Sequence, residues 1–429
     1  MDPIAPPPLR RHDHGMRRLL APFRRPVPAL IAILVAAQAL FCWRLTTPHM
    51  LVFDEIHYVP AARTLLALEG PVNIEHPLLG KALIALGIMI FGDNPLGWRA
   101  LSTLAGTAIV GGVFAIVWRM TGRTRAAAIG AVLTVVNFMV LVQARIAMLD
   151  GFMAAFVVLA VAAMGWAMRG TPAQSRWRWG LGAVLLGLAV GVKWAAVPYL
   201  GYAAIGFVLM KRGDASRWPG LRWWSAWGLL GLGAAIAYAA TFAPAFFYAR
   251  EPMTWANLLP FQLEMYARQT QILPPHHYQS VWWSWPVIGR PIWYFYEVAD
   301  GAQRGIFLLG NPAVMWGGLI AVAACALGWL RTREVRLGVA AGLWIGGFAV
   351  WAIIPKSLGF YYYYFLPAIW LSVALAVAID RWRVRLKDWD EAYLVGAVCL
   401  FVYFHPILTA GALAGPRSFL RWAWFADWR

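Results

Sequence analysis

Long apolar runs recur along almost the whole chain, and they constrain the fold more than any other feature. A helix needs roughly 20 apolar residues to cross about 30 Å of hydrocarbon. Hydrophobic residues make up 61% of the 429 residues and charged residues only 13%, a balance that a soluble fold of this size cannot bury. The sequence therefore predicts an all-α integral membrane protein. Eleven runs are candidate spans, near 27–43, 98–118, 126–143, 151–168, 179–192, 194–210, 223–248, 311–330, 337–354, 360–379 and 392–413.

A twelfth apolar run, 77–92, is shorter and contains Lys81, so its place depends on the charges of the connecting loops. If this run lies in the membrane interface, the most basic short loops all fall on one side of the membrane. The positive-inside rule assigns that side to the cytoplasm. We therefore expect about 11 transmembrane helices, interfacial helices in the first outer loop, a cytoplasmic N-terminus and an external C-terminus.

The formal net charge of +18 would suggest a nucleic-acid partner in a soluble protein. In this topology most of the surplus lies on the cytoplasmic side, so we expect membrane lipids as neighbours and no nucleic acid. The basic start of the chain is interpreted as flanking a retained first span, because no small-residue cleavage site closes that run. The expected segments are a basic cytoplasmic tail (1–26), a transmembrane domain (27–413) with long outer loops at 44–97 and 249–310, and an external tail (414–429).

Ionisable residues at the outer ends of the expected spans are the next feature, because such residues are costly near a membrane and tend to be functional. Lysine is rare in this chain, yet three of its five lysines fall outside, against the positive-inside rule. An anionic ligand on that side would explain them. The outer ionisable residues are Asp54, Glu55, Glu75, His76, Lys81, Arg145, Asp150, Lys193 and Lys356.

Asp54 and Glu55 are adjacent carboxylates that follow the first span. On a helix they point about 100° apart, so they can serve two roles at one site. One would act as a general base while the other orients a substrate. Alternatively, the pair marks only a helix N-terminus, where acidic residues are favoured.

The other outer charges also have two interpretations. Arg145 and Asp150 either form a salt bridge that closes a turn, or the guanidinium binds a phosphate oxygen while Asp150 orients it. Lys193 either extends its ammonium group to the interface or binds an anion. Lys356 precedes the run Tyr361–Tyr364, which an interfacial aromatic belt would also explain.

The segment His276–Pro286 contains three tryptophans beside polar side chains. Aromatic rings cover the apolar faces of sugars while His, Gln and Ser take hydroxyl groups, so the segment suits sugar binding. A metal site is not expected, because His276 and His277 lack further ligands at suitable spacing.

Taken in order, these motifs resemble the protein O-mannosyltransferases, glycosyltransferase family 39. The resemblance spans about residues 30–410, and it implies the multi-span GT-C fold with an acidic pair in the first outer loop. The motifs are Phe53-Asp54-Glu55, His76-Pro77-Leu78-Leu79-Gly80-Lys81, Ala144-Arg145-Ile146-Ala147-Met148-Leu149-Asp150, Gly191-Val192-Lys193-Trp194, His276–Pro286 and Arg290-Pro291-Ile292-Trp293-Tyr294.

The resemblance implies an inverting transfer of mannose from a polyprenyl-phosphate-mannose lipid to Ser or Thr hydroxyls of an exported protein, at a bacterial inner membrane. Asp54 would be the base and Glu55 would position the acceptor. No metal is required, because phosphate leaves readily once its charge is matched, although a divalent ion stays open. The remaining expected roles are phosphate binding by Arg145, Lys81, Lys193 and Lys356, orientation by Asp150 and His76, and sugar or acceptor binding by His276, Gln279, Ser280, Trp283 and Arg290.

Two departures from the family pattern are visible. The loop 249–310 is too short for the β-trefoil insert of eukaryotic members, which indicates the bacterial type. His277 and Val281 stand where the bacterial motif His-Pro-Tyr-Gln-Ser-Lys has Pro and Lys. Two alternatives stay open: another GT-C enzyme acting on lipid A or a cell-envelope glycan, and a transporter or flippase. The second would place charges near the bilayer midplane and give related halves, neither of which the sequence has.

Overall fold

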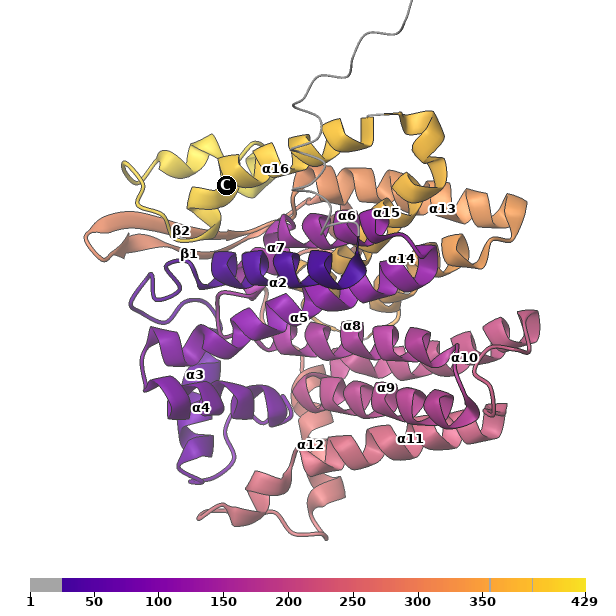
Figure 1. Cartoon of the computed structure of the whole chain (residues 1–429). Helices are drawn as coiled ribbons and strands as arrows, with labels where there is room; N and C mark the ends of the chain where they lie inside the picture. The colour runs from indigo at the N-terminus through magenta and orange to yellow at the C-terminus, as the bar shows by residue number, and fades with distance from the viewer. Residues whose placement is uncertain (1–24, 355, 388) are drawn as a thin grey trace, which may run out of the picture.

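The computed structural model describes residues 25–429 except positions 355 and 388, so the expected tail (1–26) lies almost wholly outside the described residues. Most helices run side by side, and the loops gather at the two ends of the molecule (Figure 1). The helices are α2 (Pro26–Cys42), α3 (Glu55–Leu66), α4 (Leu79–Phe91), α5 (Pro95–Thr121), α6 (Thr124–Val135), α7 (Phe138–Gln143), α8 (Leu149–Ala167), α9 (Pro172–Val192), α10 (Val197–Gly213), α11 (Trp223–Ala240), α12 (Leu258–Thr270), α13 (Gly318–Thr332), α14 (Val335–Ala349), α15 (Phe365–Leu386) and α16 (Trp389–Leu408).

Eight helices in the described part of the chain are long and apolar enough to cross a membrane. They are Pro95–Thr121, Leu149–Ala167, Trp194–Gly213, Trp223–Phe247, Ala313–Thr332, Val335–Ala352, Tyr361–Leu386 and Trp389–Leu408. The apolar runs at 27–43, 126–143 and 179–192 fall on α2, on α6 with α7, and on α9, which are not among the eight. The chain is thus a mostly helical membrane protein.

A β-hairpin in the second long loop corrects the all-α expectation. β1 (Ile292–Ala299) pairs antiparallel with β2 (Ala302–Leu308). Asp300 and Gly301 form the two-residue turn, and both have positive φ, at 48° and 73°. A two-residue Asp-Gly connection between aromatic and β-branched residues is a strong hairpin signal. Local sequence therefore specifies this hairpin, whereas hydropathy alone does not distinguish it from its helical neighbours.

The C-terminal segment 409–429 packs against the hairpin. Leu413 forms a bridge with Gln303, and the Trp293 indole N–H donates to the carbonyl oxygen of Trp428 at 3.1 Å. The Trp428 indole is buried and donates to the Ile288 carbonyl oxygen at 2.7 Å. The external tail expected at 414–429 therefore covers the hairpin.

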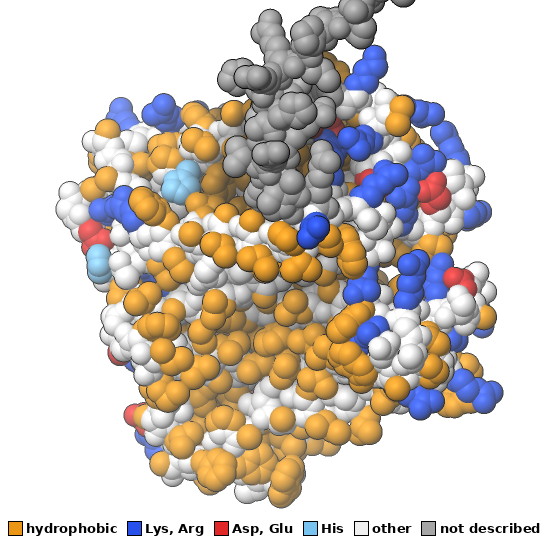
Figure 2. Space-filling model, in the orientation of Figure 1, with side chains coloured by type: hydrophobic (Ala, Val, Ile, Leu, Met, Phe, Trp, Pro, Cys, Tyr) orange, Lys and Arg blue, Asp and Glu red, His pale blue; other side chains and the backbone are white. Residues whose placement is uncertain are grey.

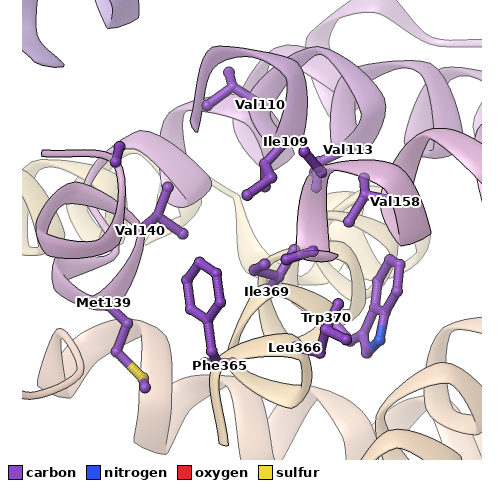
Figure 3. Close-up of a cluster of buried hydrophobic side chains, with 14 of the residues drawn as sticks. Ile109, Val110, Val113, Met139, Val140, Val158, Phe365, Leu366, Ile369 and Trp370 are labelled. Atoms are coloured by element: carbon purple, nitrogen blue, oxygen red, sulfur yellow. The ribbon is translucent and has the colours of Figure 1, made fainter. Parts of the chain in front are cut away.

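The core lies where α5, α7, α8 and α15 meet (Figure 3). α15 is buried without interruption from Phe365 to Asp380. α5 and α8 pack closely because Gly112 has no side chain: a Cβ there would lie 2.6 Å from a methyl of Val158. The labelled core side chains are Ile109, Val110, Val113, Met139, Val140, Val158, Phe365, Leu366, Ile369 and Trp370.

Hydrophobic side chains cover the middle of the visible surface, and Lys and Arg gather most densely at the end where α5, α8 and α13 end (Figure 2). Exposed apolar side chains such as Ile205 and Leu209 of α10 suit a helix face in contact with lipid. α4, with 13 residues, is about 20 Å long, too short to cross the hydrocarbon core. It therefore suits an interfacial position.

Candidate active site

Asp54 lies at the start of α3, in the loop that follows α2. Phe53 before it has positive φ (48°), which turns the chain sharply into the helix. The Asp54 carboxylate is partly exposed and accepts a hydrogen bond from the Tyr58 hydroxyl, one helical turn later, at 3.4 Å. The loop and the first turn of α3 thus present one carboxylate and one phenol together.

A buried ion pair lies close enough to Asp54 to influence its charge. Lys193, at the C-terminus of α9, contacts both carboxylate oxygens of Asp150, in the first turn of α8, at 3.0 and 2.9 Å. Burial raises the pKa of Asp54 to about 6, helped by Asp150, while Lys193 acts in the opposite direction. A carboxylate with a pKa near the working pH is well suited to general-base catalysis.

Tyrosine rings surround these charges. The Lys193 ammonium lies over the rings of Tyr362 and Tyr363, 5.2 and 5.6 Å from their centroids. Tyr294 of β1 stacks on Phe53 at 3.9 Å, and its hydroxyl accepts a hydrogen bond from Gln143. We call Asp54, Tyr58, Asp150, Lys193, Tyr294, Tyr362 and Tyr363 the Asp54 cluster.

The tyrosines of this cluster carry no predicted function from the sequence. Tyr294 belongs to the motif Arg290-Pro291-Ile292-Trp293-Tyr294, and its side chain is buried in β1. Tyr362 and Tyr363 were open to interpretation as an interfacial belt, and the structure instead places them against a buried lysine. The sequence pattern that could have identified them is a run of four tyrosines, Tyr361–Tyr364, five residues after Lys356.

Glu55 points away from the Asp54 cluster and has no free oxygen. One oxygen accepts from the Ala147 N–H and from Arg99 Nε, both at 2.8 Å. The other accepts from the Val52 N–H at 3.0 Å and from Arg99 Nη2 at 2.8 Å. Glu55 and Arg99 are both almost wholly buried. The structure therefore favours a role in anchoring the loop over the acceptor contact expected for Glu55.

Arg99 is a site residue that the sequence analysis missed. Besides Glu55, its guanidinium donates to the carbonyl oxygens of Leu45, Pro48 and Met50. It thus fastens the loop between α2 and α3 to the N-terminal turns of α5. In the sequence, Arg99 stands just inside an apolar run, where a charge is costly. That position is the pattern by which Arg99 could have been identified.

Arg145 and Lys81 donate to backbone carbonyls. Arg145 donates to the carbonyl oxygens of Phe41 and Trp43, at 2.8 and 2.6 Å, and so caps the C-terminal end of α2. Asp150 pairs with Lys193, so the alternative of an Arg145–Asp150 salt bridge is wrong. Lys81 donates to the carbonyl oxygens of Val72, Asn73 and His76, at 3.2, 2.7 and 2.9 Å. All three of its protons are therefore used within the loop.

His76 and Lys356 lie beside the cluster. The His76 ring is 6.0 Å from that of Tyr58, and burial together with three lysines lowers its pKa, so its imidazole is neutral at pH 7. Burial and the nearby Lys193 lower the pKa of Lys356 to about 8. Lys356 donates to the Gln269 carbonyl oxygen at 3.2 Å and so ties its loop to α12.

The aromatic loop 276–290 uses most of its polar groups internally. Gln279 accepts from the His276 N–H at 3.1 Å, Ser280 accepts from the Trp285 indole at 2.9 Å, and Arg290 donates to the His277 carbonyl. The Trp283 side chain, by contrast, faces outward, with 65% of its surface exposed.

This loop contacts the Asp54 cluster directly and also through Phe360. The Trp285 ring meets the Tyr363 ring edge-on, with their centroids 6.0 Å apart. Phe360 contacts the ring of His276 at 5.4 Å and stacks on Tyr362 at 5.5 Å. Of the predicted site residues, the structure thus brings together Asp54, Asp150 and Lys193, with His76 beside them. The aromatic loop lies beside them, in contact through Trp285 and through Phe360. Within the described part of the chain, no three His, Cys, Asp or Glu side chains are grouped as metal ligands.

Two family models match the chain. The model described as dolichyl-phosphate-mannose-protein mannosyltransferase matches residues 90–246. The model described as the C-terminal four TMM region of protein-O-mannosyltransferase matches residues 254–340.

Curated relatives are similar over most of their length. A polyprenol-phosphate-mannose–protein mannosyltransferase of Mycolicibacterium smegmatis is 28% identical, covering 88% of this chain and 87% of the relative. A protein of the same name from Mycobacterium tuberculosis is 27% identical, covering 88% of this chain and 86% of the relative.

Two solved structures have a similar fold. The Saccharomyces cerevisiae Pmt1-Pmt2 complex bound to the sugar donor has a TM-score of 0.81 at 12% identity, covering 96% of this chain and 94% of that one. ArnT from Cupriavidus metallidurans, in the apo state, has a TM-score of 0.63 at 17% identity, covering 93% of this chain and 68% of that one. At these identities the likeness concerns the fold alone, which is GT-C-like.

Proposed function

Because the chain belongs to the protein O-mannosyltransferase family, we propose that it transfers mannose from a polyprenyl-phosphate-mannose lipid to Ser or Thr hydroxyls of exported proteins. The observation that carries the proposal is Asp54, a carboxylate with a pKa of about 6 that lies beside the Asp150–Lys193 ion pair. A proton acceptor and a fixed cation together are what this transfer needs.

Asp54 accepts the proton of the acceptor hydroxyl. The hydroxyl oxygen then forms a bond to C1 of mannose, and the bond from C1 to the phosphate oxygen breaks. The electron pair of that bond leaves with the polyprenyl phosphate. Attack opposite the leaving group inverts the configuration, from the β-linked donor to an α-linked product.

Lys193 stabilises the charge that develops on the leaving phosphate. Its ammonium group is fixed by Asp150 and by the two tyrosine rings, so it needs no reorganisation during the reaction. Lys356 adds positive charge on the same side, and neutral His76 offers a hydrogen bond. The chemistry requires no metal, because a fixed cation meets the charge of the leaving group.

Glu55, Arg99, Arg145 and Lys81 hold the loop that carries Asp54. Each is bonded within the first outer loop or to the ends of the helices beside it. We assign phosphate binding to Lys193 and Lys356 and a positioning role to Arg145 and Lys81. In the aromatic loop, exposed Trp283 is the candidate contact for sugar or acceptor, and His276, Gln279, Ser280 and Arg290 shape the loop.

The proposed setting is a bacterial inner membrane, crossed by eleven spans, with the Asp54 cluster on the extracytoplasmic side. Support comes from the correspondence between the eleven apolar runs and α2, α5, α6 with α7, α8, α9, α10, α11, α13, α14, α15 and α16. Polyprenyl-phosphate-mannose, an exported acceptor protein and membrane lipids would be its partners.

The proposal is tested with purified protein, synthetic polyprenyl-phosphate-mannose and an acceptor peptide that contains Ser and Thr. Wild type is expected to add hexose to the peptide, and Asp54→Asn to lose about 10²- to 10⁴-fold in rate while still binding donor. Asp93→Asn, at an exposed carboxylate near α5, is the control and should keep its rate. Transfer to lipid A with no peptide product would instead support the other GT-C function.

A further inference from the structure

Three arginines gather at the far end of the helices that carry the Asp54 cluster. Arg119 is in the last turn of α5, Arg169 follows α8, and Arg178 is in the second turn of α9. Asp150 and Lys193 lie at the opposite ends of α8 and α9. α8 has 19 residues and is therefore about 28 Å long, so the three arginines lie a membrane thickness away from the site. We call them the Arg119 cluster.

Tryptophan holds the cluster together. The Arg178 guanidinium lies 4.1 Å from the centroid of the Trp166 ring, and that of Arg119 lies 5.6 Å from it. Trp177 meets the Trp166 ring edge-on at 4.9 Å. Arg178 also donates to the Arg169 carbonyl oxygen at 2.9 Å. Cation–π contacts fix the guanidinium groups but do not neutralise them.

The positive charge of the cluster is not balanced within the described part of the chain. The charges of Arg178 and Arg169 repel that of Arg119. The described carboxylates of this end pair with other arginines. These pairs are Asp214 with Arg217, Glu334 with Arg336 and Arg381, Asp380 with Arg123 and Arg336, and Asp390 and Glu391 with Arg125.

An apolar stripe leads from the cluster along α9. Trp177, Leu181 and Val184 are spaced to share one helix face, and 50%, 39% and 39% of their surfaces are exposed. Gly180 lies in the same stretch, where an added Cβ would meet no atom within 4 Å. The stripe and the cluster together match an anion that is attached to a hydrocarbon chain.

We propose that the Arg119 cluster binds the phosphate of an anionic phospholipid whose acyl chain lies along Trp177, Leu181 and Val184. Arg119 and Arg169 are exposed and present guanidinium groups that suit phosphate oxygens. Basic residues at the end of a span attract anionic headgroups.

The test uses the full chain, delipidated in detergent and titrated with dioleoyl phosphatidylglycerol or dioleoyl phosphatidylcholine. Phosphatidylglycerol is expected to raise the thermal unfolding temperature and to stay bound in native mass spectrometry, and phosphatidylcholine to do neither. Loss of two basic contacts, in R119Q/R169Q, should weaken apparent phosphatidylglycerol affinity about 30-fold. R119K/R169K keeps both charges and should stay within about fivefold of wild type.

The matched control is R212Q/R331Q, which removes two exposed arginines from the ends of α10 and α13 at the same end of the molecule. It should change the affinity by less than about threefold. Four results would overturn the proposal: equal loss in the control, equal effects of the two lipids, the same stabilisation by glycerol phosphate without acyl chains, or a lysine variant as weak as the glutamine variant. Mannose transfer is not part of the readout, so this outcome is independent of the proposed function.

Discussion

Asp54 is held in surroundings that favour its protonated form more than water does. Burial raises the pKa of its carboxyl from 3.8 to about 6, and the negative charge of Asp150 acts in the same direction. The positive charge of Lys193 and the hydrogen bond from Tyr58 oppose this shift. The balance leaves most of the carboxylate ionised at pH 7 while giving it more basicity than an exposed aspartate has.

This balance predicts an acid limb in the pH profile. A protonated Asp54 cannot accept the hydroxyl proton, so kcat/KM should fall about tenfold per pH unit below a pKa near 6. Lys193→Gln removes the positive charge that lowers the pKa of Asp54. The pH below which kcat/KM falls should therefore be higher in this variant. Peptide mannosylation measured against pH checks both, with Lys387→Gln at the far end of the molecule as control. A limb that stays in place in Lys193→Gln would contradict the assigned coupling.

The buried pair of Arg99 and Glu55 gives a second prediction at the scale of residues. Arg99→Ala leaves the Glu55 carboxylate buried without its cation, which should cost about 3–5 kcal/mol of stability. Arg63→Ala, in an exposed pair with Asp93, should cost less than about 1 kcal/mol. Unfolding temperatures in detergent would compare them. The double variant E55L/R99M should recover part of the loss, and no recovery would mean that the pair matters for reasons other than its charge.

At the scale of elements, the β-hairpin connects the C-terminal segment to the Asp54 cluster. Trp293 and Tyr294 are neighbours on β1, where the register shifts between Trp293 and Phe295 and leaves Tyr294 without a partner on β2. Trp293 contacts the C-terminal segment through the carbonyl of Trp428, and Tyr294 stacks on Phe53, next to Asp54. The position of the loop that carries Asp54 therefore depends on residues more than 350 positions later in the chain.

Trp428→Ala is expected to destabilise the protein by about 3–5 kcal/mol, because it removes a buried indole and leaves the hairpin uncovered. It should also lower kcat/KM for peptide mannosylation through the looser support of Tyr294. Leu420→Ala, at a side chain that is 45% exposed, should change stability by less than about 0.5 kcal/mol. A Trp428→Ala protein that melts early yet keeps full kcat/KM would show that the hairpin does not position the site.

On the scale of the whole molecule, charge and apolar surface are arranged as layers. The Asp54 cluster lies at one end of the helices, the Arg119 cluster at the other, and exposed apolar side chains lie between them (Figure 2). α15 passes through the centre, and its residues from Phe365 to Asp380 are buried by the surrounding helices. This arrangement suits a protein whose helices carry groups to both membrane surfaces.

The proposed eleven spans predict that the two termini lie on opposite sides of the membrane. Single cysteines placed near the N-terminus and after Trp428, in a cysteine-free background, should react with a membrane-impermeant thiol reagent only at the C-terminal position in intact cells. Permeabilised cells, in which both positions should react, provide the control. Labelling of both positions in intact cells would require an even number of spans.

The sequence alone determined the membrane character of the chain and the two ends at which its charges gather. Both follow from local properties, because the length of an apolar run and the charge of a short loop need no tertiary contact. The same holds for the family motifs, which are short and contiguous, and for the Asp-Gly turn of the hairpin, which is a local signal.

Only the tertiary structure decided which charges meet. Asp150 pairs with Lys193, 43 positions away, and Glu55 pairs with Arg99, 44 positions away. No local pattern specifies such a partner, because it depends on how helix ends are brought together by packing. Asp54 was therefore identifiable from the sequence as a candidate base, whereas the Lys193 beside it, the tyrosines around it and the anchoring role of Glu55 depend on the folded arrangement of α3, α5, α8, α9 and β1.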